Sequence, residues 1–112
     1  MVANQTPEFD ARFLTALPVF NEVESVDSVL NLVGQYSRNI LVVDDGSTDG
    51  TAKKLRARSD IRLIRHDTNQ GYGAALQTTF QYARDNGFEF LVTIDCDGQH
   101  EPQRVREFVQ KS

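Results

Sequence analysis

Short apolar runs recur along this chain at regular intervals, and each is followed by a more polar segment. Such runs, rich in β-branched and aromatic residues, are typical of strands that are buried in a sheet. The predicted strands cover residues 13–17, 40–43, 61–64 and 88–94.

Apolar residues at spacings of three and four fill the segments between these runs and predict helices. The predicted helices cover residues 23–33, 52–55 and 72–83. A fourth helix is predicted to begin at Pro102, with Val105, Phe108 and Val109 on its inward side. Strict alternation of four strands and four helices predicts an α/β fold, in which a Rossmann-like parallel sheet carries helices on both faces.

Capping residues mark the ends of several predicted helices. Asn21 is a candidate N-cap for the first helix, and Thr48 or Asp49 for the second. Gly34 and Gly87 stand where the first and third helices are expected to stop.

The polarity of the strands predicts their positions in the sheet. The run at 61–64 contains Arg62 and suits a sheet edge, whereas the run at 88–94 is apolar on both faces and suits the centre. The sequence offers no fifth strand to pair with the free edge of this central strand. Three explanations stay open: a truncated chain, a homodimer that pairs these exposed edges, or a sheet order that places the strand between two others.

Composition fits one globular domain: the chain has 112 residues, and 12 basic against 16 acidic side chains give a net charge of −4. Nucleic acid is therefore not an expected partner. Residues 1–11 are expected to form a flexible leader, and residues 12–112 the domain. The single cysteine, Cys96, favours a reducing, cytoplasmic compartment, and no apolar run is long enough to span a membrane.

Polar side chains gather where three of the predicted strands end. Because ligands of an open parallel sheet bind beyond the carboxyl ends of its strands, these segments are expected to line one crevice. The three segments are Pro18-Val19-Phe20-Asn21-Glu22, Asp44-Asp45-Gly46-Ser47 and Asp95-Cys96-Asp97-Gly98-Gln99.

The segment after the fourth strand has the chemistry of a metal site. Asp95 and Asp97 stand two residues apart and project to the same side of an extended chain, and Gln99 repeats the spacing. Carboxylate and amide oxygens are ligands for Mg²⁺ or Mn²⁺. The alternative is that the two acids only form a turn that caps the last helix. Cys96 is expected to face the buried side.

The two acids after the second strand, Asp44 and Asp45, are expected to have different roles. One is expected to accept hydrogen bonds from a base or ribose while the other orients the loop; an Asx turn with an N-cap is the alternative. The two histidines, His66 and His100, are not assigned as catalytic bases.

Two glycines, Gly71 and Gly73, stand at the start of the third helix, within Asn69-Gln70-Gly71-Tyr72-Gly73. Backbone N–H groups here could face an anion. Close packing of the helix on the sheet explains the glycines as well, and this second interpretation is favoured.

Taken in order, four motifs resemble glycosyltransferase family 2. The form of the last motif is most similar to the polyprenyl-phosphate sugar transferases, a group typified by dolichol-phosphate mannose synthase. The motifs are Pro18-Val19-Phe20-Asn21-Glu22, Val43-Asp44-Asp45-Gly46-Ser47-Thr48-Asp49, Asn69-Gln70-Gly71-Tyr72-Gly73-Ala74-Ala75 and Asp95-Cys96-Asp97-Gly98-Gln99-His100.

This resemblance implies the nucleotide-binding half of a GT-A fold, with an inverting, metal-dependent glycosyltransferase activity. The donor would be a GDP- or UDP-sugar, and the acceptor a lipid phosphate at the cytoplasmic face of a membrane. Family members continue for about another hundred residues, so the catalytic base and the acceptor site are expected beyond Ser112, and this chain alone is expected to be inactive. The resemblance places Pro18, Phe20, Glu22 and Asp45 near the base and ribose, and Asp95, Asp97 and Gln99 around the metal.

Three other classes of protein compete with this interpretation. A non-catalytic nucleotide-binding module would share the fold and lack the acceptor half. A receiver domain also has paired acids after a strand, but there they end the first strand, and here a strand and a helix precede Asp44. A sugar nucleotidyltransferase usually has a glycine-rich loop with Arg and Lys after its first strand, which the segment 18–22 does not provide.

Overall fold

The part of the chain that the structure describes forms one five-stranded sheet with three helices. The computed structural model describes residues 11–96 together with the backbone of residues 105–109. The sheet order is β3-β2-β1-β4-β5. In chain order, the elements are β1 (Phe13–Val19), α1 (Val26–Val33), β2 (Ile40–Asp45), α2 (Thr51–Arg56), β3 (Arg62–His66), α3 (Tyr72–Asp85), β4 (Phe90–Ile94) and β5 (Val105–Val109).

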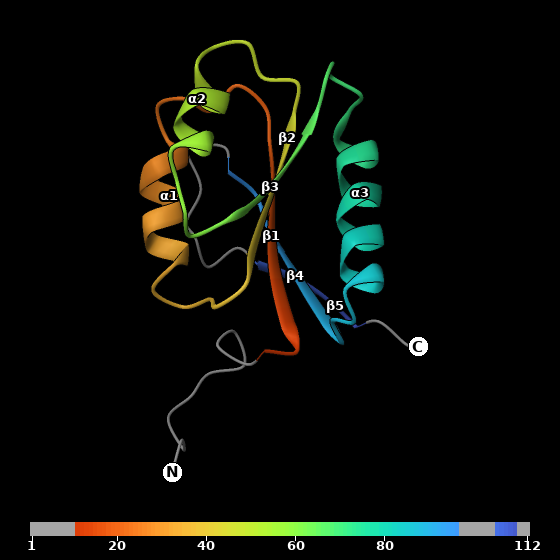
Figure 1. Cartoon of the computed structure of the whole chain (residues 1–112). Coiled ribbons are helices and arrows are strands. Elements are labelled where there is room, and N and C mark those ends of the chain that lie inside the picture. The colour runs from red at the N-terminus through yellow and green to blue at the C-terminus, as the bar shows by residue number, and fades with distance from the viewer. Residues whose placement is uncertain (1–10, 97–104, 110–112) are drawn as a thin grey trace.

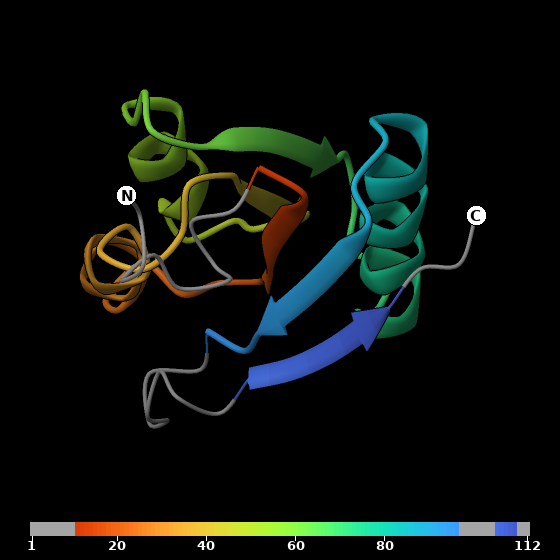
Figure 2. The ribbon, with the colours of Figure 1, turned by 90° about the horizontal axis from the view of Figure 1, so that it is seen from below.

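The molecule has three layers, with α1 and α2 on one face of the sheet and α3 on the other (Figures 1 and 2). Successive residues of a strand point to opposite faces. In β2, Ile40 and Val42 belong to the core under α1 and α2, whereas Leu41 and Val43 belong to the core under α3. The predicted α/β arrangement with helices on both faces is therefore confirmed.

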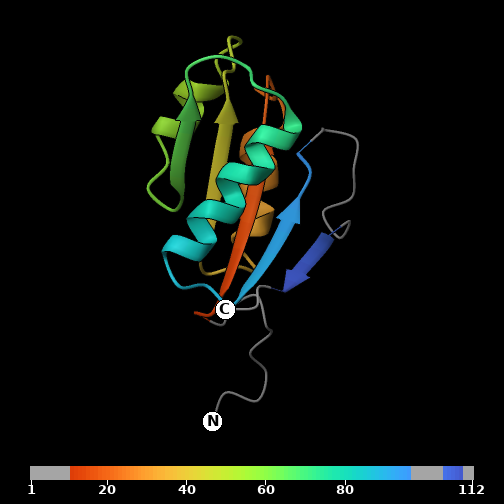
Figure 3. The same ribbon diagram turned by 90° about the vertical axis from the view of Figure 1, so that its right-hand side faces the viewer.

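The first four strands are parallel, and their positions match the prediction from polarity. The polar strand β3 forms one edge, and β4 lies inside the sheet, next to β1. Because β2 and β4 are both parallel to β1, the carboxyl ends of the three strands lie at the same end of the sheet (Figure 3).

The helix predicted after Pro102 is wrong for residues 105–109, which form β5. This strand pairs with β4 in antiparallel fashion, from Ile94 opposite Val105 to Phe90 opposite Val109, and its arrow in Figure 3 points against the other four. The spacing of the apolar residues fits a short helix, but an unpaired edge of β4 would leave a row of buried backbone groups without partners. Backbone pairing with β4 therefore outweighs the helical spacing of the apolar residues in this segment.

Pairing with β5 also answers the question of the free edge. Within the chain, β4 lies between β1 and β5, so the sheet is mixed rather than wholly parallel. The edge that suggested a homodimer is paired inside one molecule.

Two of the predicted caps differ from the structure. Helix α1 begins at Val26 with Ser25 as its N-cap, so Asn21 is not the cap. Helix α2 has Gly50 as its N-cap, although Asp49 accepts a hydrogen bond from the Thr51 backbone N–H at 3.0 Å. Local sequence located α1 and α2 but not their N-caps.

The two predicted helix stops are confirmed. Gly34 is the C-cap of α1, and Gly87 follows the end of α3 with a left-handed φ of 76°. Among the residues that the structure describes, no helix has the length and apolar character needed to cross a bilayer.

Candidate functional site

A cavity of about 610 Å³ opens beyond the carboxyl ends of β1, β2 and β4, beside the start of α3. This is the place where ligands bind in open α/β sheets. The lining residues come from four segments that are distant in sequence: Pro18, Val19, Phe20, Glu22, Asp45, Asn69, Gly71, Tyr72, Ala75, Asp95 and Cys96. Five of the residues predicted for the site, Pro18, Phe20, Glu22, Asp45 and Asp95, are thus brought together.

Two aromatic rings border this cavity and remain open to solvent. Phe20 is 43% exposed and Tyr72 is 47% exposed, although large aromatic side chains usually lose most of their surface on folding. The Tyr72 hydroxyl donates a hydrogen bond to Asp95 Oδ1 at 3.1 Å. The rings therefore give the cavity flat apolar walls next to an acidic group.

Asp45 is the buried acid of the cavity, and the chain itself satisfies most of its hydrogen bonds. Its Oδ1 lies 2.7 Å from His66 Nδ1 and accepts from the Gln70 N–H at 3.0 Å, while its Oδ2 accepts from the Gly71 N–H at 2.9 Å. Burial alone would raise the pKa of Asp45, but the hydrogen bonds from His66, Gln70 and Gly71 outweigh it and lower the pKa below its ordinary value of 3.8. Asp45 is therefore ionised at neutral pH.

The segment before α3 does face an anion, and that anion is the Asp45 carboxylate. The backbone N–H groups of Gln70 and Gly71 both point to it. A Cβ added at Gly71 or Gly73 would meet nothing within 4 Å, so the favoured explanation of close helix packing is wrong. Gly71 instead supplies a φ of 100°, which side chains disfavour, and this lets its N–H turn toward Asp45.

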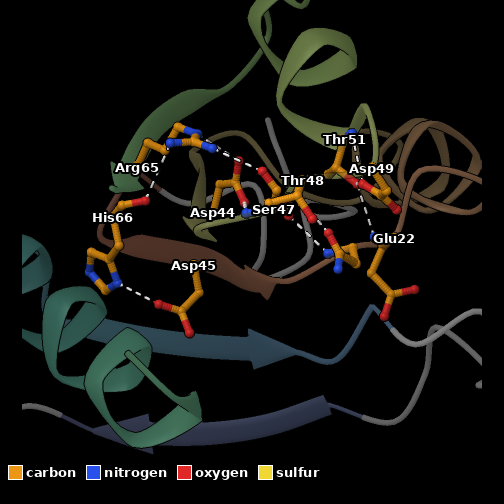
Figure 4. A network of polar contacts seen from close by, with 10 residues as sticks. Glu22, Asp44, Asp45, Ser47, Thr48, Asp49, Thr51, Arg65 and His66 are labelled. Atoms are coloured by element: carbon orange, nitrogen blue, oxygen red, sulfur yellow. Dashed lines mark hydrogen bonds and ion pairs between the residues drawn. The ribbon is translucent and has the colours of Figure 1, made fainter. Parts of the chain in front are cut away.

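Asp44 is fully buried and lies outside the cavity lining, and Figure 4 shows it between Ser47 and Arg65. Its Oδ1 accepts from the Ser47 N–H at 3.0 Å, and its Oδ2 lies 3.4 Å from Arg65 Nε. Arg65 also donates to the Ser47 carbonyl oxygen at 2.9 Å. These contacts hold the turn after β2, so Asp44 is the member of the pair that orients the loop.

Hydrogen bonds join the segment after β1 to the segment between β2 and α2. Asn21 takes part in two of them: its N–H donates to Ser47 Oγ, and its Oδ1 accepts from the Thr48 N–H, each at 2.8 Å. Asn21 adopts a φ of 52°, the only left-handed value among non-glycine residues in the described part of the chain. The next two residues continue the junction: the Glu22 N–H donates to Thr51 Oγ1, and the Val23 N–H to Asp49 Oδ2. This junction fixes the position of Phe20 and Glu22 relative to Asp45.

Of the predicted metal ligands, only Asp95 belongs to the described residues. Asp97 and Gln99 lie outside them, as does His100. Within the described ranges, no group of three or more His, Cys, Asp or Glu side chains is arranged to hold a metal ion. Cys96 is 4% exposed and packs in the core under α1 and α2, as expected for the buried face.

The model of one protein family, described as glycosyl transferase family 2, matches residues 15–112. The chain belongs to this family. The match covers all four segments that line the cavity.

Relatives from bacteria and archaea support the family 2 assignment. The chain is 32% identical over 105 residues to an undecaprenyl-phosphate mannosyltransferase of Micrococcus luteus, covering 88% of this chain and 43% of that protein. It is 36% identical over 101 residues to a polyprenol monophosphomannose synthase of Mycolicibacterium smegmatis, covering 84% and 38%. It is 30% identical over 111 residues to a UDP-N-acetylglucosamine–dolichyl-phosphate N-acetylglucosaminyltransferase of Methanococcus voltae, covering 84% and 44%. The chain therefore spans less than half of the length of each relative.

Sequence reasoning missed two side chains that support the acid of this cavity, His66 and Thr78. His66 is paired with Asp45 in the register of β3 and β2, and its Nε2 lies 2.8 Å from Thr78 Oγ1. The available signal in the sequence was that His66 closely follows the predicted strand at 61–64, as the other polar segments of the site follow theirs. Which residues stand side by side in a parallel pair depends on the register, which the sequence does not state.

Proposed function

We propose that this chain is the nucleotide-sugar-binding portion of an inverting, metal-dependent glycosyltransferase that transfers a sugar to a lipid phosphate. One observation carries this proposal: the same cavity is lined by the exposed rings of Phe20 and Tyr72, by the ionised acid Asp45 and by Asp95. The relatives include an undecaprenyl-phosphate mannosyltransferase, a dolichyl-phosphate N-acetylglucosaminyltransferase and a polyprenol monophosphomannose synthase.

The nucleoside would occupy the part of the cavity between β1 and β2. Phe20 and Pro18 offer apolar surface for a base, and Asp45 offers an ionised acceptor for N–H or O–H groups of a base or ribose. Glu22 stands at the same border. Asp44, the other candidate for contact with a base or ribose, would contribute indirectly by holding the loop that carries Asp45.

A divalent cation, Mg²⁺ or Mn²⁺, would be held by Asp95, Asp97 and Gln99. The fit rests on Asp95, a carboxylate at the cavity border whose Oδ1 also accepts from Tyr72. Oxygen donors of this kind suit hard cations. When bound, the ion neutralises charge on the diphosphate as it leaves.

In this proposal, the acceptor and any catalytic base belong to the part of the relatives that this chain does not span. A phosphate acceptor is already anionic, so attack on the anomeric carbon needs no strong base. The compartment proposed for the reaction is the cytoplasmic face of a membrane.

Calorimetric titration with GDP and with UDP, each with and without Mn²⁺, tests the donor site. We expect one nucleotide to bind in a metal-dependent manner and Asp97→Ala to abolish the metal dependence. The matched control is Asp85→Ala, which removes an exposed carboxylate at the far end of α3. Failure of the folded wild-type chain to bind either nucleotide would overturn the donor-site assignment.

A nucleotide-binding module without transfer activity is the second candidate, because the residues that line the described cavity are assigned to the nucleotide and the metal, and none of them to a catalytic base. The two candidates differ in the fate of a nucleotide-sugar donor. Slow donor hydrolysis that depends on Asp97 supports the enzyme, and unchanged donor after long incubation supports the binding module.

A further inference from the structure

His66 is a partly buried histidine that no catalytic step uses, and both of its ring nitrogens have partners. It ends β3 between β2 and α3, with its side chain 11% exposed. Nδ1 lies 2.7 Å from Asp45 Oδ1, and Nε2 lies 2.8 Å from Thr78 Oγ1 on α3. The ring therefore links the acid of the cavity to the helix that covers this face of the sheet (Figure 4).

The hydrogen-bond partners decide where the ring carries a proton. An ionised carboxylate only accepts, so Nδ1 must be the donor toward Asp45. Thr78 Oγ1 also lies 3.1 Å from the Ala74 carbonyl oxygen. Its hydroxyl can donate to Nε2, or donate to Ala74 and accept from a protonated Nε2. The Nδ1–H donor is thus kept in either protonation state of the ring.

The donors around Asp45 leave little of its carboxylate for a ligand. A carboxylate oxygen offers two lone pairs. His66 and Gln70 occupy both on Oδ1, and Gly71 occupies one on Oδ2. A ligand in the cavity therefore meets a single remaining acceptor position, on Oδ2.

We propose that His66 is a positioning residue for this acceptor: its Nδ1–H fixes Oδ1 of Asp45, so that Oδ2 is presented to one donor group of the nucleoside. The inference rests on the proposed function, because it assigns His66 a role in the affinity for the nucleotide. His66 acts through Asp45 and does not touch the ligand itself.

Two amide variants, each of which matches the position of one ring nitrogen, separate this role from a merely structural one. In His66→Asn the amide nitrogen is as many bonds from Cβ as Nδ1 is, so it can still donate to Asp45. In His66→Gln the amide lies one bond further out and reaches toward Thr78 instead. We expect His66→Asn to bind the nucleotide within about threefold of the wild type, and His66→Gln to bind about tenfold or more weakly.

The experiment is the metal-dependent titration with GDP and UDP on wild type and both variants, together with ¹⁵N NMR of the His66 ring. A shared loss of folding stability without a difference in affinity between the two variants would mean that His66 is structural only. A ring that carries its proton on Nε2 alone would also overturn the inference. If the wild type binds neither nucleotide, the proposed function fails and the role of His66 fails with it, whereas binding that is lost in Asp97→Ala but equal in both His66 variants refutes His66 alone.

Discussion

Gly46 is the residue at which two loops of the site come closest. A Cβ added there would lie 2.5 Å from the Asn69 backbone nitrogen and 2.6 Å from the Thr68 carbonyl carbon, and its φ of 82° is left-handed. We expect Gly46→Ala to lower the free energy of unfolding by about 3–4 kcal/mol, because strain and overlap with backbone add.

Gly87→Ala is the matched control for this prediction. Gly87 has a similar φ of 76°, but an added Cβ would meet nothing within 4 Å. The expected loss is about 1–2 kcal/mol, from backbone strain alone. Urea unfolding of both variants measures the difference, and equal losses would show that the close approach to Thr68 and Asn69 carries no weight.

Asn21 combines a left-handed backbone with a side-chain hydrogen bond to the Thr48 N–H. Asn21→Gly keeps the backbone freedom and loses the hydrogen bond, for an expected loss of about 0.5–1.5 kcal/mol. Asn21→Ala loses both, and we expect a further loss of about 1–2 kcal/mol. Chemical unfolding of the two variants tests this order; a more stable Ala variant would contradict it.

Strand β5 pairs with the outer edge of β4 and so protects that edge of the sheet. In β4, Leu91 is buried in the core under α3, and Val92 is buried in the core under α1 and α2. A chain that ends at residue 104 would expose the backbone groups of this apolar strand. We expect it to be less stable and to associate, as measured by unfolding and by size-exclusion chromatography with light scattering.

A chain that ends at Val109 is the control for this shortening, because it retains β5. It is expected to behave as the full chain does. If the chain that ends at residue 104 stays monomeric and equally stable, pairing with β5 contributes nothing to the integrity of the sheet.

The sequence predicts an element correctly where its local apolar pattern agrees with its position in the folded sheet. The strand at 40–43 is apolar on both faces and lies inside the sheet as β2, between β3 and β1, and the periodic segment at 72–83 lies on the sheet as α3. Residues 105–109 have a helical spacing and form a strand, because an edge of β4 nearby offers backbone partners that a sequence pattern cannot display. Local periodicity describes one face of a segment, and pairing depends on what lies beside it.

The same limit applies to the candidate site. Alternation of strands and helices is enough to predict that the segments 18–22 and 44–47 meet at one end of the sheet, and they do. The residue pattern alone could not distinguish Asp44 from Asp45, since their contacts depend on Arg65 and His66, two residues of β3. Strand register, which links them, emerges only when the whole sheet forms.

Three carboxyl groups in different parts of the molecule, those of Asp45, Asp49 and Asp60, make its stability sensitive to acid. Burial would raise the pKa values of Asp45 and Asp49, but hydrogen bonds from His66 to the first and from Thr51 to the second outweigh it and lower both below 3.8. The hydrogen bond from Arg58 lowers the pKa of Asp60 as well. Each group thus binds protons less readily in the native state than in the unfolded state.

It follows that the free energy of unfolding is highest above the unfolded carboxyl value of 3.8 and decreases as the pH falls through the lower native values. Asp60→Asn is expected to flatten this acid dependence. It is expected to cost about 1 kcal/mol or less at pH 7, because the Asp60 side chain is 49% exposed and water screens its pair with Arg58. Urea unfolding between about pH 2 and pH 7 measures both effects, with Asp85→Asn as a control that removes an exposed carboxylate from α3. If Asp60→Asn and the wild type lose stability in parallel as the pH falls, the ion pair of Asp60 with Arg58 does not contribute to the acid sensitivity of the fold.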